Sequence, residues 1–287
     1  MMRKRLRFAK YEACGNDFIL IDEMSGRRTP DRTRSSLATK FCDRHFQIGA
    51  DGVIFIEKAH GVDCAMRLFE PAGNEADMCG NGIRCVAAYL SYGIRKSEVT
   101  VMSRDGVKDI TVSSKGYRVN MGKVRCTGAD LKEYWTGCRK MTDSTLYVSV
   151  AAKNRRLQGA LVNTGEPHLV FKSEDVDTED VVGISEAING DRRRFPGGVN
   201  VNFAQPVGPH DIKVRTYERG VYDETLACGT GATATAGVAL KKGWVKPGTV
   251  KVHPPGGCIS IEIGKDGNAY MTGPATKVFE GVVSIDI

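Results

Sequence analysis

The chain has 287 residues, with 41 Lys and Arg against 34 Asp and Glu, and a formal net charge of +7. This length allows one large domain or two smaller domains that each bury a core. The basic clusters are short and lack interleaved aromatic residues, so we interpret them as solvated surface and expect no nucleic-acid partner. A modest positive charge suits small anionic substrates. No run approaches the ~20 apolar residues of a membrane span, so we expect no membrane partner.

Nine cysteines are scattered along the chain, and none forms a Cys-x-x-Cys pair. The odd number of cysteines and the absence of such pairs argue against a disulfide framework and give little support for a zinc site. The N-terminus is basic but lacks the apolar core of a secretory signal. These features predict a reducing, cytoplasmic location.

The first half of the chain predicts strands, a helix, strands, a second helix and further strands. Gly15, Asn16 and Asp17 indicate a turn between the first two strands, and Gly93 indicates the end of the second helix. The expected strands cover 7–9, 18–22, 53–58, 65–69, 99–103, 110–113 and 117–121, and the expected helices cover 34–44 and 82–92.

From Leu146 the second half repeats this order. The expected strands cover 160–163, 169–172, 199–203, 212–217, 249–252, 258–263, 269–272 and 278–285, with a helical stretch at 173–189 and a helix at 231–242. Two halves of similar size and order predict a duplicated α+β fold.

Each half contains a cysteine and a glycine turn at the start of an alanine-rich helix, as Cys79-Gly80-Asn81-Gly82 and as Cys228-Gly229-Thr230-Gly231. Unpaired N–H groups and a partial positive charge at a helix N-terminus bind carboxylates and favour a thiolate. The glycines permit close approach of the backbone to a ligand. If the halves face each other, a carboxylate can lie between the helix ends with one sulfur on each side of a carbon. That arrangement is suited to inverting a stereocentre.

This chemistry addresses the weak acidity of an amino-acid Cα–H, for which pyridoxal phosphate normally supplies the electron sink. The sequence contains no convincing candidate lysine for that cofactor, and we expect none. Negative charge on the reacting carboxylate would instead be met by the helix ends in a dry pocket. One thiolate would remove the proton while the opposite thiol delivers another.

Other functions stay open on the residues alone. Gly229-x-Gly231-x-x-Ala234 fits a dinucleotide fingerprint loosely, but no acidic residue follows at the required distance. Cys79 and His168 fit an acyl-transfer nucleophile and base, a scheme that leaves Cys228 unexplained. Cys79 and Cys85 lack a second pair of metal ligands, so no metal site is expected. A non-catalytic amino-acid-binding protein on the same fold is a further alternative.

Several separated blocks resemble the diaminopimelate epimerase family, the pyridoxal-independent two-cysteine epimerases. In family order and over nearly the whole length, they are Gly15-Asn16-Asp17-Phe18, Gly49-Ala50-Asp51-Gly52, Met78-Cys79-Gly80-Asn81-Gly82-Ile83-Arg84-Cys85, Val119-Asn120-Met121-Gly122, Pro167-His168, Tyr217-Glu218-Arg219-Gly220, Ala227-Cys228-Gly229-Thr230-Gly231 and Pro255-Gly256-Gly257. The resemblance implies two pseudo-symmetric domains, each a barrel-like, mostly antiparallel sheet around a central helix, with the active site in the cleft between them. The expected domains are 1–122, joined by a returning strand at 275–287, and 123–274.

The resemblance also implies roles for individual residues. Cys79 and Cys228 match the acid/base pair, and His168 and Glu218 match residues that adjust the protonation of the thiols. The implied substrate-binding positions are Asn16, Gly52, Glu70, Gly80, Asn81, Glu166, Asn200, Glu218, Arg219, Gly229 and Thr230. The implied activity interconverts LL- and meso-diaminopimelate in the lysine and cell-wall precursor pathway, and a homodimer is a family-level expectation.

Two positions depart from the family pattern. Members commonly carry Asn-Ala-Asp-Gly-Ser where this chain has 70–74, and often Gly-Asn-Pro-His where it has 165–168, so that Glu70 and Glu166 replace asparagines that contact the distal end of diaminopimelate. A carboxylate ~4 Å from the distal carboxylate would repel it by up to ~4 kcal/mol at an effective dielectric near 20. The alternative substrate is therefore a basic amino acid, namely lysine, ornithine, arginine or histidine. Retention of Asn200 and Arg219 favours diaminopimelate, and pairing of Glu166 with a nearby arginine is the competing explanation for that glutamate.

Overall fold

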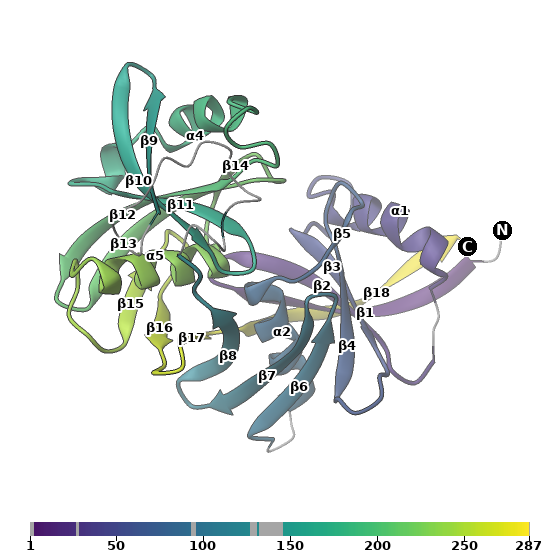
Figure 1. The fold of residues 1–287 in the computed structure, drawn as a ribbon. Coiled ribbons are helices and arrows are strands. Elements are labelled where there is room, and N and C mark those ends of the chain that lie inside the picture. The colour runs from purple at the N-terminus through teal and green to yellow at the C-terminus, as the bar shows by residue number, and fades with distance from the viewer. Residues whose placement is uncertain (1–2, 27–28, 93–95, 127–130, 132–145, 287) are drawn as a thin grey trace. The chain divides into compact units, whose positions relative to one another are not determined.

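The computed structural model describes residues 3–26, 29–92, 96–126, 131 and 146–286 (Figure 1). The chain forms two compact units, one of Met1–Asn120 with Thr272–Ile287 and the other of Met121–Met271. Within the described residues, no helix is long and apolar enough to cross a membrane.

The first unit surrounds one helix with strands. Its elements are β1 (Arg3–Ala13), β2 (Asn16–Glu23), α1 (Asp31–Cys42), β3 (Gly52–Glu57), β4 (Cys64–Phe69), β5 (Glu75–Ala76), α2 (Gly80–Ser91), β6 (Glu98–Ser103), β7 (Gly106–Ser113), β8 (Gly116–Lys123) and β18 (Thr276–Asp286). β18 pairs antiparallel with β1, and β1 pairs antiparallel with β2. β2 pairs parallel with β3, and β3 pairs antiparallel with β4. β4 pairs antiparallel with β5 and parallel with β6, and β6 pairs antiparallel with β7. Helix α2 contacts β1, β2, β4, β6, β7 and β18, so strands enclose it.

The second unit repeats the same order of pairing. Its elements are β9 (Leu146–Ala152), β10 (Arg155–Asn163), β11 (Pro167–Lys172), the 3-10 helix η1 (Val176–Thr178), α4 (Val181–Gly190), β12 (Asn200–Gly208), β13 (Asp211–Glu218), β14 (Asp223–Thr225), α5 (Gly229–Lys241), β15 (Val250–His253), β16 (Ile259–Ile263) and β17 (Asn268–Gly273). The strand pairings of the first unit recur in the second. The strands β18, β1, β2, β3, β4, β5, β6 and β7 correspond in turn to β9, β10, β11, β12, β13, β14, β15 and β16, and the two parallel pairs of the second unit are β11/β12 and β13/β15. Helix α5 contacts β10, β11, β12, β13, β15 and β16, and five of these six strands are counterparts of strands that contact α2. The α+β fold class expected from the sequence is confirmed.

The composition of the two enclosed helices follows from this position. A helix with strands on all sides must be apolar or small all round. Helix α5 accordingly buries Ala232, Ala234, Ala236 and Ala239, each at most 1% exposed. Small side chains let the surrounding strands approach the helix closely, and this explains why the alanine-rich stretches follow the cysteines.

The parallel strands explain the continuous apolar run at 53–56. All four residues of that run are fully buried, which is typical of a strand covered on both faces. Phe55 belongs to the core formed with Leu37 and Phe41 of α1, while Ile54 faces the first turn of α2 at Gly82.

Several expected bounds are wrong for identifiable reasons. The stretch 173–189 is two helices, because the side chains of Asp175 and Asp180 each accept a backbone hydrogen bond and cap a separate start, at η1 and at α4. Helix α1 begins at Asp31 instead of residue 34. The first turn lies at Cys14 and Gly15, with φ of 55° and 81°, so Asn16 already belongs to β2. Strands β5, β9 and β14 are additional to those that the sequence predicts.

Candidate active site

Cys79 is the N-cap of α2. Its backbone is extended, with φ of −140° and ψ of 120°, and its Sγ accepts a hydrogen bond from the backbone N–H of Gly82 at 3.4 Å. The thiol is half-buried. The sulfur therefore occupies the position in which an N-cap side chain meets the positive end of a helix, which stabilises negative charge.

Cys228 is the N-cap of α5 in the same geometry. Its φ is −113° and its ψ is 115°, and its Sγ accepts from the N–H of Gly231 at 3.3 Å. The hydroxyl of Thr230 also lies 3.3 Å from this sulfur. Cys228 is more deeply buried, at 7% exposed. The two cysteines thus occupy equivalent places in the two units.

Three other cysteines behave as core residues. Burial raises the pKa of the Cys42 and Cys64 thiols to about 12 and raises the pKa of Cys85 well above its usual value. A buried thiol that stays protonated is a small apolar side chain without nucleophilic character.

The first turn of each helix contains the residues that are expected to form a cradle of backbone N–H groups. In α2, Gly80 and Asn81 are buried, and the Asn81 Oδ1 accepts from Arg84 Nη2 at 2.7 Å. Arg84 also donates to the Gly80 carbonyl at 3.2 Å and to the carbonyl of Pro274 at 3.1 Å. This fully buried arginine braces the first turn of α2, a role that the sequence does not predict although Arg84 lies within the first cysteine block. In α5, Gly229 and Thr230 take the corresponding positions.

His168 lies in β11 and is fully buried. Its Nδ1 faces the Asn202 Nδ2 at 3.1 Å, and the Asn202 Oδ1 accepts from the Thr216 hydroxyl at 3.0 Å. Its Nε2 is buried and has no hydrogen-bond partner among the described residues. Burial lowers the pKa of His168 to about 3, and the positive charge of Arg219 contributes in the same direction. The ring is therefore neutral at pH 7.

Glu218 ends β13 beside the second cysteine block. Its carboxylate accepts a hydrogen bond from the hydroxyl of Thr225, which ends β14, and Cys228 follows three residues later. The pairing of β13 with β14 therefore places the Glu218 carboxylate beside the segment that leads into the N-terminus of α5.

Glu166, Asn200 and Arg219 converge in the second unit. Arg219 donates to the Glu166 Oε2 through Nε, at 2.7 Å, and through Nη2, so the competing explanation, pairing of Glu166 with an arginine, is observed. Asn200 accepts from the Arg219 backbone N–H at 2.9 Å and donates to the carbonyl of Pro167 at 3.1 Å. The turn that carries Glu166 is fixed to the cysteine helix, since the Thr164 hydroxyl donates to the carbonyl of Thr230 at 3.1 Å.

Asn16 and Gly52 lie in neighbouring strands of the first unit. The buried Asn16 Oδ1 has no hydrogen-bond partner among the described residues. The following residue, Asp17, exchanges hydrogen bonds with Asp51, the residue before Gly52, and both carboxylates bind Arg44. A Cβ at Gly52 would lie 2.8 Å from the Leu68 side chain, so the close packing there requires glycine.

Glu70 directly follows β4 and opens a turn. Its N–H donates to the carbonyl of Asn74 at 2.9 Å, and its own carbonyl accepts from Gly73 at 2.8 Å. The candidate residues of the first unit are therefore Asn16, Gly52, Glu70, Cys79, Gly80 and Asn81, and those of the second unit are Glu166, His168, Asn200, Glu218, Arg219, Cys228, Gly229 and Thr230.

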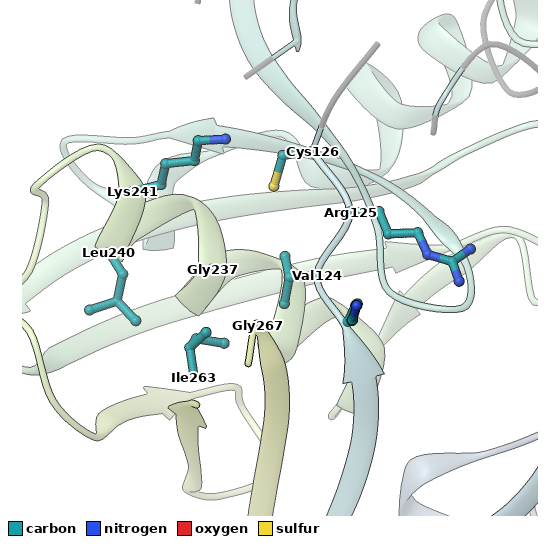
Figure 2. A pocket seen from close by; sticks show the side chains of 9 residues that line it. Val124, Arg125, Cys126, Gly237, Leu240, Lys241, Ile263 and Gly267 are labelled. Atoms are coloured by element: carbon teal, nitrogen blue, oxygen red, sulfur yellow. The ribbon is translucent and has the colours of Figure 1, made fainter. Parts of the chain in front are cut away.

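A pocket of about 560 Å³ lies elsewhere in the second unit (Figure 2). It is lined by Lys123, Val124, Arg125, Cys126, Gly237, Leu240, Lys241, Ile263 and Gly267. Its helical wall is the C-terminal half of α5, whereas Cys228 caps the opposite end of that helix, and none of the candidate residues lines it. In the part of the chain that the structure describes, no group of three or more His, Cys, Asp or Glu side chains is arranged to hold a metal ion.

The chain is similar to known proteins over nearly its whole length. The family model described as diaminopimelate epimerase matches residues 8–127 and 160–278. The diaminopimelate epimerase of Methanothrix thermoacetophila is 40% identical over 288 residues, which cover 99% of this chain and 98% of that protein. The diaminopimelate epimerase of Methanocella arvoryzae is 37% identical over 284 residues, which cover 98% of each.

Solved structures share the fold at low sequence identity. A phenazine biosynthesis protein of the PhzF family from Bacillus anthracis has a TM-score of 0.70 at 14% identity, covering 98% of this chain and 99% of that one. A hydroxyproline epimerase from Agrobacterium vitis has a TM-score of 0.67 at 14% identity, covering 100% and 95%. The family match and the full-length relatives show that this chain belongs to the diaminopimelate epimerase family of isomerases.

Proposed function

We propose that this chain interconverts LL- and meso-diaminopimelate by moving a proton at one α-carbon, without pyridoxal phosphate. The observation that carries the proposal is the pair of N-cap cysteines, Cys79 and Cys228, at equivalent places in two duplicated units. The names of the relatives support the substrate.

The chemistry balances with two thiols and no other acid or base. One cysteine, as a thiolate, takes the Cα proton and becomes a thiol, while the other, as a thiol, protonates the opposite face and becomes a thiolate. The reverse reaction exchanges their roles. Both sulfurs must act on one carbon, so we propose that each unit contributes its cysteine to a single substrate-binding site.

Charge that develops on the substrate carboxylate would be met by backbone N–H groups of the two helix starts, at Gly80 and Asn81 and at Gly229 and Thr230. Removing one preorganised donor of this kind typically costs about 3 kcal/mol, or about a hundredfold in rate. His168 and Glu218 would adjust the charge of the sulfurs, His168 as a neutral hydrogen-bond donor and Glu218 as a carboxylate.

The Glu166–Arg219 ion pair supports diaminopimelate over a basic amino acid. Because Arg219 already offsets the charge of Glu166, the glutamate does not make this region acidic on its own. The distal end of diaminopimelate carries an ammonium and a carboxylate, which match Glu166 and Arg219 respectively. The single distal cation of lysine or ornithine would bring no carboxylate for Arg219 to bind.

We further propose that the two compact units are the two domains of the enzyme and that it acts in the cytoplasm, where reducing conditions keep both thiols available for proton transfer. The expected homodimer also remains a proposal. The compactness of each unit, with boundaries at 120/121 and 271/272, supports the two-domain assignment.

The proposal is tested by hydrogen exchange in D2O without added pyridoxal phosphate. The purified protein is incubated with LL- and meso-diaminopimelate, lysine, ornithine, arginine and histidine, and Cα deuteration is followed by mass spectrometry. We expect exchange with diaminopimelate only. Exchange with lysine but not with diaminopimelate would assign the site to a basic amino acid, and no exchange with any of them would refute the epimerase.

Three cysteine variants make the test specific. Cys79→Ser and Cys228→Ser should each lose epimerisation, because serine is a far weaker acid than cysteine. Cys258→Ser is the matched control, since Cys258 is exposed and lies outside the candidate site. Full epimerisation by either of the first two variants would rule out the two-thiol mechanism.

A further inference from the structure

The two units place different side chains at the same three positions of their sheets. In the parallel pair β11/β12, His168 lies opposite Asn200, as Phe18 lies opposite Gly52 in β2/β3. In the next antiparallel pair, Asn202 lies opposite Thr216, as Ile54 lies opposite Leu68. The second unit therefore has the trio His168, Asn202 and Thr216 where the first unit has Phe18, Ile54 and Leu68.

Both trios are buried beside the first turn of the cysteine helix. All six side chains are at most 4% exposed. A Cβ on Gly82 would lie 3.1 Å from Ile54 and 3.6 Å from Phe18, and a Cβ on Gly231 would lie 2.6 Å from the Asn202 Oδ1. Because the first unit fills these positions with apolar side chains, the fold itself does not require a polar trio.

Stability does not account for the polar trio either. A buried polar atom without a hydrogen bond costs about 1–3 kcal/mol, and His168 Nε2 is such an atom among the described residues. The apolar trio carries no such cost. Neither the fold nor its stability explains the polar trio, which points to a functional role for His168.

The hydrogen bonds of Asn202 determine the protonation of His168. The carbonyl of Leu169 can only accept a hydrogen bond. The end of the Asn202 amide that lies 3.4 Å from this carbonyl is therefore the donor, Nδ2. The Thr216 hydroxyl donates to the Oδ1 on the other side. The Nδ2 must then donate to His168 Nδ1, which acts as the acceptor, and the proton of the neutral ring resides on Nε2.

We propose that Asn202 and Thr216 are positioning residues that hold His168 as its neutral Nε2–H tautomer, so that it donates a hydrogen bond to a cysteine thiolate during the reaction and never takes a proton itself. The role assigned to the thiolate rests on the proposed function. A proton on Nδ1 would face the N–H of Asn202, so the tautomer that carries its proton on Nδ1 is disfavoured. Burial of the ring and the positive charge of Arg219, which is paired with Glu166, disfavour the imidazolium.

The first test observes the tautomer directly and needs no activity. Protein labelled with 15N in histidine is studied by two-bond 1H–15N correlation, and the His168 signals are identified by their loss in His168→Gln. We expect an unprotonated Nδ1 and a protonated Nε2 from about pH 8 to about pH 5. An imidazolium, or a proton on Nδ1, in this range would overturn the proposal.

The second test perturbs the positioning residues. Asn202→Asp places a carboxylate opposite Nδ1 of His168, so the ring proton should move from Nε2 to Nδ1. A histidine ionisation should then appear in the pH profile of kcat/KM for α-proton exchange. Thr216→Val should lower kcat/KM about tenfold through loss of one buried hydrogen bond, and Thr216→Ser should restore it. A Thr216→Val enzyme with unchanged kcat/KM, or an Asn202→Asp enzyme with an unchanged tautomer, would refute the positioning role.

Asn189→Leu is the matched control for the loss of a buried amide. Asn189 is 5% exposed and makes three hydrogen bonds to the backbone of Ser185 and Val199, none of which involves His168. Its variant should lose stability and keep the His168 tautomer. If the expected tautomer is found but the wild-type protein exchanges no substrate, the proposed function fails while the assignment of the tautomer stands.

Discussion

Lowering the pH from about 7.5 to about 5 should destabilise the fold by about 2 kcal/mol through His168 alone. In the unfolded chain this side chain gains a proton near its ordinary pKa of 6.5, whereas burial lowers the pKa in the folded protein to about 3. The folded state therefore holds fewer protons than the unfolded state between these values, and its stability decreases as the pH falls. The stabilisation is complete above about pH 6.5, and its full loss, near pH 3, amounts to about 5 kcal/mol.

Urea unfolding followed by circular dichroism measures this effect at both pH values. His168→Gln removes the ionising group, so the pH dependence of its unfolding free energy should be about 2 kcal/mol smaller than in the wild type. His60→Gln, at an exposed histidine, is the control and should retain the dependence of the wild type. Equal losses of stability in the wild type and in His168→Gln would refute the assignment of a neutral, buried histidine.

Gly231→Ala should abolish epimerisation and destabilise the fold by about 1–3 kcal/mol, because its Cβ would lie 2.6 Å from a buried side-chain oxygen. Gly190→Ala, whose Cβ would meet nothing within 4 Å, should be tolerated in the same activity and unfolding assays. Glu166→Gln should raise KM for diaminopimelate about tenfold with little change in kcat, since it removes the proposed partner of the distal ammonium, and steady-state kinetics would contradict the proposal by showing an unchanged KM. Arg219→Met should raise KM further, as it removes the proposed partner of the distal carboxylate. Asp17→Asn should cost up to about 2 kcal/mol of unfolding free energy at neutral pH, because burial of Asp17 is outweighed by hydrogen bonds from basic side chains that lower its pKa to about 2. This contribution disappears as the pH falls from about 3.8 through about 2, and a constant difference between wild type and variant over that range would contradict it.

The sequence predicts the α+β fold class and the two cysteine helices because their signals are local. A cysteine followed by a glycine turn and then alanines specifies an N-cap and a helix that strands can enclose, and both helices start within two residues of the expected positions. The helical stretch after β11 differs from the prediction because the capping side chains of Asp175 and Asp180 divide it.

The contacts of the site could not be predicted, because they join residues that are far apart in sequence. Asn202 lies between the buried Val201 and Phe203 and resembles an ordinary strand residue until its hydrogen bonds to His168 and Thr216 are known. The arginine partner of Glu166 likewise comes from a distant segment. It is the residue after β13, and it is brought near by the pairing of β11 with β12 and of β12 with β13. Only the register of the strands supplies these neighbours.

Deuterium incorporation in the first turnovers tests the two-thiol mechanism most directly. LL-diaminopimelate is added to the wild-type enzyme in D2O, and both isomers are separated and analysed by mass spectrometry before equilibrium. With Cys79 and Cys228 on opposite faces of the carbon, newly formed meso-diaminopimelate should carry one deuterium while the recovered LL isomer carries almost none. Deuterium that enters the recovered LL isomer as fast as the meso product would show that a single base acts on both faces, and would contradict the account.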